Sequence, residues 1–164
     1  MARRRMVLKQ VEMGATQYSA LSIAALLLAS ASAAAQVTVT DGDTIHVNGT
    51  IYRLWGIDAP EMHQACTDGW PAGIEAKLAL EQLMAGRAIT CEDRGHDRYR
   101  RTIGLCRANG KDVQARMVKL GMAWAFTRYS SDYISEEKAA IQARAGVHAH
   151  ECEKAWDWRT EHRR

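Results

Sequence analysis

The most constraining feature of this sequence is a series of short strand-like segments separated by turn signals. Asn48-Gly49 and Asn109-Gly110 are dipeptides that favour tight hairpin turns, and apolar or β-branched residues flank them. The chain therefore opens as a β-meander and folds around a small sheet. The five predicted strands lie at residues 37–40, 44–47, 50–55, 88–92 and 102–108.

Helical periodicity appears between and after these segments. Residues 73–84 place Ala76, Leu80, Leu83 and Met84 on one face, and Gly86 ends the pattern. Further helices are predicted at 113–120 and at about 130–145, the latter with acidic residues near its start and Gly146 beyond its end. Pattern alone therefore gives an α+β fold class.

The N-terminus is typical of an export signal. Basic residues precede an apolar run at 20–29, and small residues follow at 30–35. We expect a signal peptide at 1–35 cleaved after Ala35, a main domain at 36–147 and a C-terminal tail at 148–164. An uncleaved membrane anchor, a twin-arginine signal at Arg4-Arg5 and a start at Met13 remain alternatives. After cleavage we expect no stable membrane association.

Charge is informative only through its distribution. Cleavage at this position removes four basic residues and one acidic residue, so the net charge falls from +3 to 0. The mature chain as a whole therefore gives no argument for nucleic acid binding. Arginines are nevertheless concentrated near predicted loops, where they would form either a local positive groove or merely a solvated basic face.

Carboxylates and an arginine gather around the first hairpin. Asp41 and Asp43 lie in Asp41-Gly42-Asp43-Thr44, while Arg53 and Asp58 follow in the apolar stretch that ends at Glu61. Carboxylate oxygens are ligands for Ca²⁺ or Mg²⁺, and a guanidinium offers two parallel donors to a phosphate. The bland interpretation is a simple Asp-Gly turn, but an arginine within an apolar strand needs a partner. This combination indicates metal-assisted phosphate chemistry.

Two later motifs complete a resemblance. Together with Asp97-Arg98-Tyr99-Arg100-Arg101-Thr102 and Leu120-Gly121-Met122-Ala123, the stretch from 37 to 147 resembles the staphylococcal-nuclease (thermonuclease) family. The resemblance implies a five-stranded OB-fold β-barrel with about three helices. It also implies a Ca²⁺-dependent phosphodiesterase that uses one ion.

The resemblance implies specific metal ligands. Asp43 and Asp58 would bind the ion directly, the Ala59 backbone carbonyl would be a further ligand, and Asp41 would lie in the outer sphere. Glu61 would orient or deprotonate the attacking water. These roles suit oxygen-donor carboxylates around a divalent cation.

The resemblance also implies the residues that hold the substrate. Arg53 and Arg101 would bind the phosphate from two sides, while Arg98, Tyr99 and Tyr129 would contact the nucleotide.

Three positions depart from the family pattern. Arg100 stands where glycine is common, Thr127 stands where an aromatic residue can line the nucleotide pocket, and Val147-His148 replaces an apolar-Trp ending. These departures concern the preferred substrate more than the type of reaction.

Four cysteines in an exported chain favour disulfides. Cys91 and Cys106 lie on two strands that we expect to pair, so a bridge between them is predicted; Cys66 and Cys152 would form the second. Four cysteines allow three connectivities. A zinc site built from His63, Cys66, His148, His150 and Cys152 is the competing use, although its spacing matches no standard pattern.

The leading hypothesis is a monomeric, secreted or periplasmic endonuclease that hydrolyses DNA and RNA. One alternative is an OB-fold module that binds nucleic acid or protein without catalysis. Another is an exported structural domain with a metal-stabilised tail.

Overall fold

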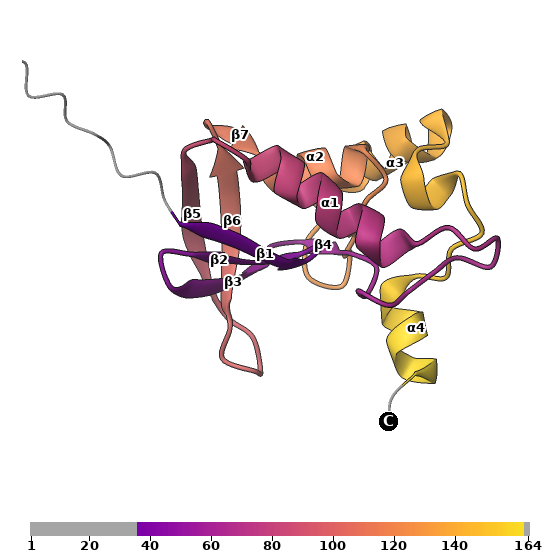
Figure 1. The fold of residues 1–164 in the computed structure, drawn as a ribbon, viewed down its shortest axis with the longest axis horizontal. Coiled ribbons are helices and arrows are strands. Elements are labelled where there is room, and N and C mark those ends of the chain that lie inside the picture. Colours follow the sequence, from indigo (N-terminus) through magenta and orange to yellow (C-terminus); the bar gives the residue numbers. More distant parts are fainter. Residues whose placement is uncertain (1–35, 163–164) are drawn as a thin grey trace, which may run out of the picture. The chain divides into compact units, whose positions relative to one another are not determined.

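A computed structural model describes residues 36–162 (Figure 1). The predicted signal peptide at 1–35 lies outside the described residues. The strands are β1 (Val37–Asp41), β2 (Thr44–Val47), β3 (Thr50–Leu54), β4 (Ile57–Asp58), β5 (Ile89–His96), β6 (Thr102–Ala108), β7 (Lys111–Asp112) and β8 (Trp124–Ala125). The helices are α1 (Ala72–Met84), α2 (Val113–Lys119), α3 (Ile134–Ala143) and α4 (Ala155–Glu161), with a 3₁₀ turn η1 (Gly146–His148) before α4.

The main sheet has the strand order β1-β2-β3-β6-β5, and β7 adds to β6. Neighbours pair antiparallel except β3 and β6, which run parallel. A separate two-stranded ladder joins β4 to β8. In consequence, the end of β3 and the whole of β4 lie where the chain leaves the main sheet, and Arg53 and Asp58 are on this stretch.

The α+β class is confirmed, but two details of the expected fold differ. Within residues 36–162 no ladder joins β1 to β5, so the sheet is not a closed five-stranded barrel. Over the described residues the strands number eight and the α-helices four, against an expected five and three. The three additional strands have two residues each, which is too short for an alternating pattern to be visible in sequence.

The main core lies between the sheet and the first two helices. Ala76, Leu80 and Met84 recur every four residues and are buried on α1, as a helix packed on a sheet requires. Asp112 caps α2 by accepting a hydrogen bond from the Ala115 N–H at 2.8 Å. Buried Gln114 then donates to the Gly104 carbonyl at 3.2 Å, which ties α2 to β6.

A second hydrophobic cluster lies apart from this core. Trp124, Val147 and Ala155 are buried in it, and Trp70 and Trp156 pack against them. The segment predicted as a C-terminal tail thus contains a helix with its own packing partners, and Figure 1 shows α4 (yellow) below the other helices. None of the described helices is both long and apolar enough to cross a membrane.

Both disulfides considered from the sequence are present. Cys91–Cys106 joins directly paired residues of β5 and β6, and Cys66–Cys152 joins residues 86 positions apart. The two cysteines of the zinc alternative are therefore bonded to each other.

The bridge between β5 and β6 should contribute measurable stability. Replacing Cys91 and Cys106 together by serine should lower the free energy of unfolding by about 3 kcal/mol, the chain-entropy value for a loop of this length. Urea denaturation with and without reductant measures this difference. A double variant as stable as the oxidised parent would show that the bridge adds nothing.

Candidate active site

The turn between β1 and β2 places Asp43 in the protein interior. The Asp43 N–H donates to Asp41 Oδ1 at 3.1 Å, which closes the turn, and the Asp43 side chain is only 2% exposed. Gly42 allows this turn to approach α1, because a Cβ there would lie 2.6 Å from the Ala59 Cβ and 2.7 Å from the Ala76 Cβ. Close packing on α1 thus fixes where the first carboxylate points.

The second carboxylate comes from β4. Asp58 pairs with Trp124 in the β4–β8 ladder and is fully buried. The next residue links the two carboxylates, since the Ala59 N–H donates to Asp43 Oδ2 at 2.8 Å. Glu61 follows on a segment held against α1, where a Cβ on Gly73 would lie 1.9 Å from the Glu61 carbonyl oxygen.

Arg53 joins the two buried carboxylates. Its Nη1 pairs with Asp43 Oδ1, and its Nη2 lies 2.5 Å from Asp58 Oδ1. The arginine side chain is 19% exposed, so one face remains open to solvent. Two charges buried in this way need paired, hydrogen-bonded partners, and the guanidinium supplies them.

Burial and charge act in opposite directions on this group. Burial raises the pKa of Asp43 to about 8, while the Arg53 guanidinium limits the rise and the neighbouring Asp41 and Asp58 add to it. Burial would lower the pKa of Arg53, but Asp43 and Asp58 outweigh that effect and raise it. Arg53 is therefore charged, and Asp43 is a carboxylate that a further cation would help to ionise.

A second arginine reaches these carboxylates from α4. Arg159 Nη2 lies 2.6 Å from Asp58 Oδ2, and its Nη1 lies 3.1 Å from Asp58 Oδ1 and 2.7 Å from Glu61 Oε1. Both oxygens of Asp58 are thus engaged by guanidinium groups. Arg159 lies in the segment that we predicted as a tail, and sequence reasoning missed it.

Arg101 does not pair with these carboxylates. Its Nη2 lies 2.7 Å from Asp97 Oδ2, and its backbone N–H donates to Asp97 Oδ1 at 2.9 Å. Partial burial would raise the pKa of Asp97, but these hydrogen bonds lower it. Arg100, at the position where glycine is common, has φ 65°, the left-handed conformation that glycine adopts without strain.

A groove lies between the β5–β6 loop and α4. It has a volume of about 700 Å³ and is lined by Arg98, Tyr99, Trp158, Arg159 and His162; we call it the α4 groove. Two of the three residues predicted to contact substrate, Arg98 and Tyr99, therefore face this space. Tyr129 is not among its lining residues and packs against Phe126, with ring centroids 5.2 Å apart.

The donors suit a hard divalent cation. Asp43 and Asp58 offer only oxygen ligands, and they are brought together around one point by Arg53. In the part of the chain that the structure describes, no three acidic, histidine or cysteine side chains form a preassembled metal cluster. The positive charge that faces the Asp58 carboxylate comes instead from Arg53 and Arg159. A cation bound by Asp58 would therefore take the place of a guanidinium.

Comparison with known proteins finds a matching family and several relatives. A family model described as "Staphylococcal nuclease homologue" matches residues 51–150. The succinoglycan biosynthesis protein ExoI of Rhizobium meliloti is 38% identical over 137 residues, covering 76% of this chain and 72% of that protein. The Oryza sativa protein named "Probable staphylococcal-like nuclease CAN1" is 34% identical over 131 residues, covering 78% of this chain.

A third relative, from Haemophilus influenzae, is named "Uncharacterized endonuclease" and is 37% identical over 103 residues, or 60% of this chain. The chain spans 54% of that protein and 38% of the Oryza sativa one. The two relatives that are named as nucleases support a nuclease function, and the family model covers the segment that carries Arg53, Asp58, Glu61 and Arg101. The chain belongs to the family of staphylococcal nuclease homologues.

Proposed function

We propose that this protein is a Ca²⁺-dependent endonuclease that hydrolyses phosphodiester bonds in DNA and RNA. The observation that carries the proposal is Arg53 held between two buried carboxylates, with Glu61 next to them. A purely structural ion pair would not need this excess of acidic groups. Acidic groups around an arginine are, by contrast, what metal-assisted attack on a phosphate requires.

The proposed roles follow from the side chains present. Asp43, Asp58 and the Ala59 carbonyl would hold Ca²⁺, with Asp41 further out, and the bound ion would supply positive charge at the phosphate. Arg53 presents the exposed face of its guanidinium to two phosphate oxygens. Arg101 would approach from the β5–β6 loop after exchanging Asp97 for phosphate. Both arginines stabilise the charge that develops during in-line attack.

Glu61 would take a proton from the attacking water. Its side chain is 33% exposed and projects next to Asp58, where solvent reaches it. As water forms its bond to phosphorus, one proton passes to Glu61, the opposite P–O bond breaks, and the departing oxygen takes a proton from solvent. Glu61 should first release Arg159, because the guanidinium paired with its Oε1 favours the ionised carboxylate and so makes Glu61 a weaker base.

The proposal includes export and action as a monomer outside the cytoplasm. Two disulfides are consistent with an oxidising compartment.

A plasmid assay tests the proposed function. Protein recovered from the periplasm or medium, with an intact mass showing loss of residues 1–35, should cleave supercoiled plasmid and an RNA transcript in Ca²⁺. Cleavage should stop in chelator. Plasmid left intact but bound would favour the alternative of a non-catalytic nucleic-acid-binding module, and full-length cytoplasmic protein would contradict export.

A further inference from the structure

The segment before α4 is anchored to the loop that follows Glu61. Cys152 is bonded to Cys66, and the Thr67 N–H donates to the Glu151 carbonyl at 3.1 Å. His150 stacks on Trp70 with ring centroids 4.4 Å apart. These contacts fix the chain within a few residues of α4.

One buried side chain connects this anchor to the active site directly. Gln64 is 2% exposed; its Oε1 accepts from the Glu61 N–H at 3.1 Å, and its Nε2 donates to the Glu153 carbonyl at 2.7 Å. The backbone of Glu61 and the start of α4 are therefore held by the same amide. This shared hydrogen-bonding partner fixes the position of α4 relative to the active site.

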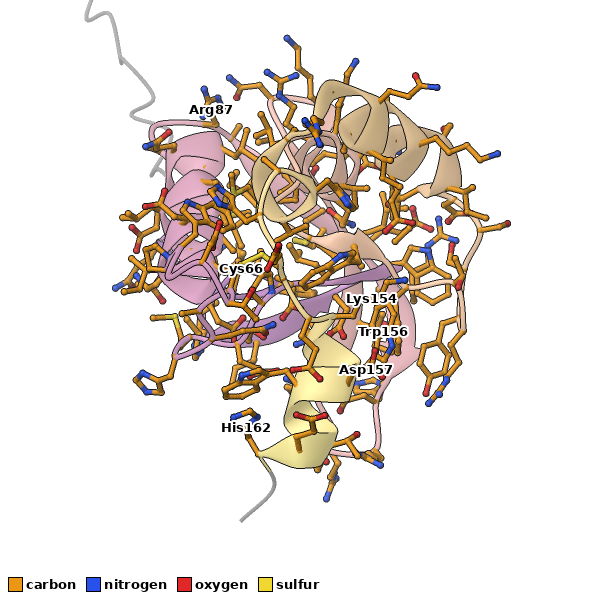
Figure 2. The ribbon with its side chains drawn as sticks, turned by 90° about the vertical axis from the view of Figure 1, so that its right-hand side faces the viewer. Cys66, Arg87, Lys154, Trp156, Asp157 and His162 are labelled. Carbon is orange, nitrogen blue, oxygen red and sulfur yellow. A yellow bond between two sulfur atoms is a disulfide. The ribbon has the colours of Figure 1, made fainter. Side chains whose placement is uncertain are left out.

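Packing on the other side of α4 sets its rotation. Ala155 is fully buried, and Trp156 lies against Phe126 and Trp124, with ring centroids 5.4 Å and 6.3 Å apart. Figure 2 labels Trp156 on α4 and His162 just beyond its end. With Trp156 packed into this cluster, Trp158 and Arg159 are left to face the α4 groove.

The groove has the chemistry of a nucleic-acid strand site. Arg98 and Tyr99 form one wall and Trp158, Arg159 and His162 the other. Trp158 and His162 stack with ring centroids 4.2 Å apart, and the Arg98 guanidinium lies 4.7 Å from the Tyr99 ring centroid. Bases stack on aromatic faces, while arginines donate hydrogen bonds to phosphates.

We propose that α4 completes the substrate site: Trp158 stacks a base of a bound nucleic-acid strand, and Arg159 leaves Asp58 and Glu61 to bind a phosphate when Ca²⁺ occupies the carboxylates. This inference rests on the proposed function. It adds to Arg53 and Arg101 a third arginine, and it assigns a role to a helix outside the segment that the family model matches.

The exchange of partners follows from charge and shape. Arg159 binds both oxygens of Asp58, and two phosphate oxygens offer the same two-pronged acceptor. A cation on Asp58 competes with the guanidinium for those oxygens. Arg159 is 33% exposed and already lines the groove, so a side-chain movement alone brings it to a phosphate there.

Two opposite effects of one substitution test the proposal. Arg159→Gln should raise Ca²⁺ affinity at least about threefold, because a competitor for Asp58 has been removed. It should lower affinity for a fluorescein-labelled, cleavage-resistant phosphorothioate oligothymidylate about tenfold in Ca²⁺. Calorimetry measures the first quantity and fluorescence anisotropy the second. Misfolding would lower both affinities.

Two further variants separate the parts of the proposal. Trp158→Ala should weaken oligonucleotide binding about tenfold and leave Ca²⁺ affinity unchanged. Arg87→Gln is the matched control, because Arg87 lies away from α4 in Figure 2 and should change either affinity less than about twofold.

The wild type should bind the oligonucleotide more tightly in Ca²⁺ than in chelator, and Arg159→Gln should lose most of that gain. Oligonucleotide affinity unchanged in both Arg159→Gln and Trp158→Ala would overturn the proposal, as would a wild type that cleaves plasmid but does not bind the probe. Binding with the predicted pattern but without plasmid cleavage would instead contradict the proposed nuclease function. It would leave standing the proposal that the α4 groove binds a nucleic-acid strand.

Discussion

Arg53→Ala is expected to lower the single-turnover rate of cleavage about a thousandfold and to destabilise the Ca²⁺-free protein by about 3 kcal/mol. The rate falls because the guanidinium that faces the phosphate is lost. Stability falls because Asp43, at 2% exposure, loses its ion-pair partner, whereas Asp58 retains Arg159. Denaturation should be measured near pH 9, above the wild-type pKa of about 8 of Asp43. Loss of Arg53 raises the pKa of Asp43 further, so the variant must either protonate Asp43 or bury its charge unpaired.

Calcium should reverse much of the stability loss and none of the rate loss. An ion bound by Asp43 and Asp58 supplies the missing positive charge, so the Ca²⁺-induced stabilisation should be larger in Arg53→Ala than in the wild type. Arg53→Lys keeps a charge but only one donor group, and should recover more stability than rate. Stability equal to the wild type in chelator would mean that Arg53 does not compensate the buried carboxylates.

Much of the fold was predictable because its patterns are local. The strands expected at 44–47 and 102–108 coincide with β2 and β6, and the helix expected at 73–84 is α1 within one residue. β5 was predicted to end at residue 92 but continues to His96, since pairing with β6 extends it past Gly95. The last predicted helix, at 130–145, is reduced to α3 and ends where Arg144 adopts a left-handed conformation.

The part of the site that comes from one short stretch could also be predicted. Asp43, Arg53, Asp58 and Glu61 lie within 19 consecutive residues, and a hairpin brings them together. Arg159 is 98 residues beyond Glu61 and reaches it through a disulfide and a second hydrophobic cluster. Neither the disulfide nor the second hydrophobic cluster produces a periodic pattern in the sequence. The available hints were Cys152 and the sequence Trp156-Asp157-Trp158, which is unusually aromatic for a terminal tail.

The second large effect concerns Asp43 and the pH dependence of Ca²⁺ binding. Because burial raises its pKa to about 8, a proton occupies Asp43 below that pH and must leave before Ca²⁺ binds. Apparent Ca²⁺ affinity should therefore fall up to about tenfold for each pH unit below 8 and level off above it. Asp43→Asn should lower affinity about a hundredfold and flatten this dependence.

Stability of the Ca²⁺-free protein should change with pH in the opposite sense. The folded-state pKa of Asp43 lies above its ordinary value of 3.8, so its contribution is fully present below that value and is lost as pH rises through about 8. The wild type in chelator should lose stability between about pH 4 and pH 8 and level off above that, and Asp43→Asn should lose less.

Glu61→Gln is the matched comparison, because it alters a neighbouring carboxylate whose proposed role is proton transfer. It should retain the Ca²⁺ affinity and pH slope of the wild type while the cleavage rate falls at least about tenfold, or about 1.4 kcal/mol in barrier height. Calorimetric Ca²⁺ titration beside single-turnover cleavage distinguishes the two variants. Equal Ca²⁺ affinities for Asp43→Asn and the wild type, or near-normal cleavage by Glu61→Gln, would show that the ligand and the base have been assigned to the wrong residues.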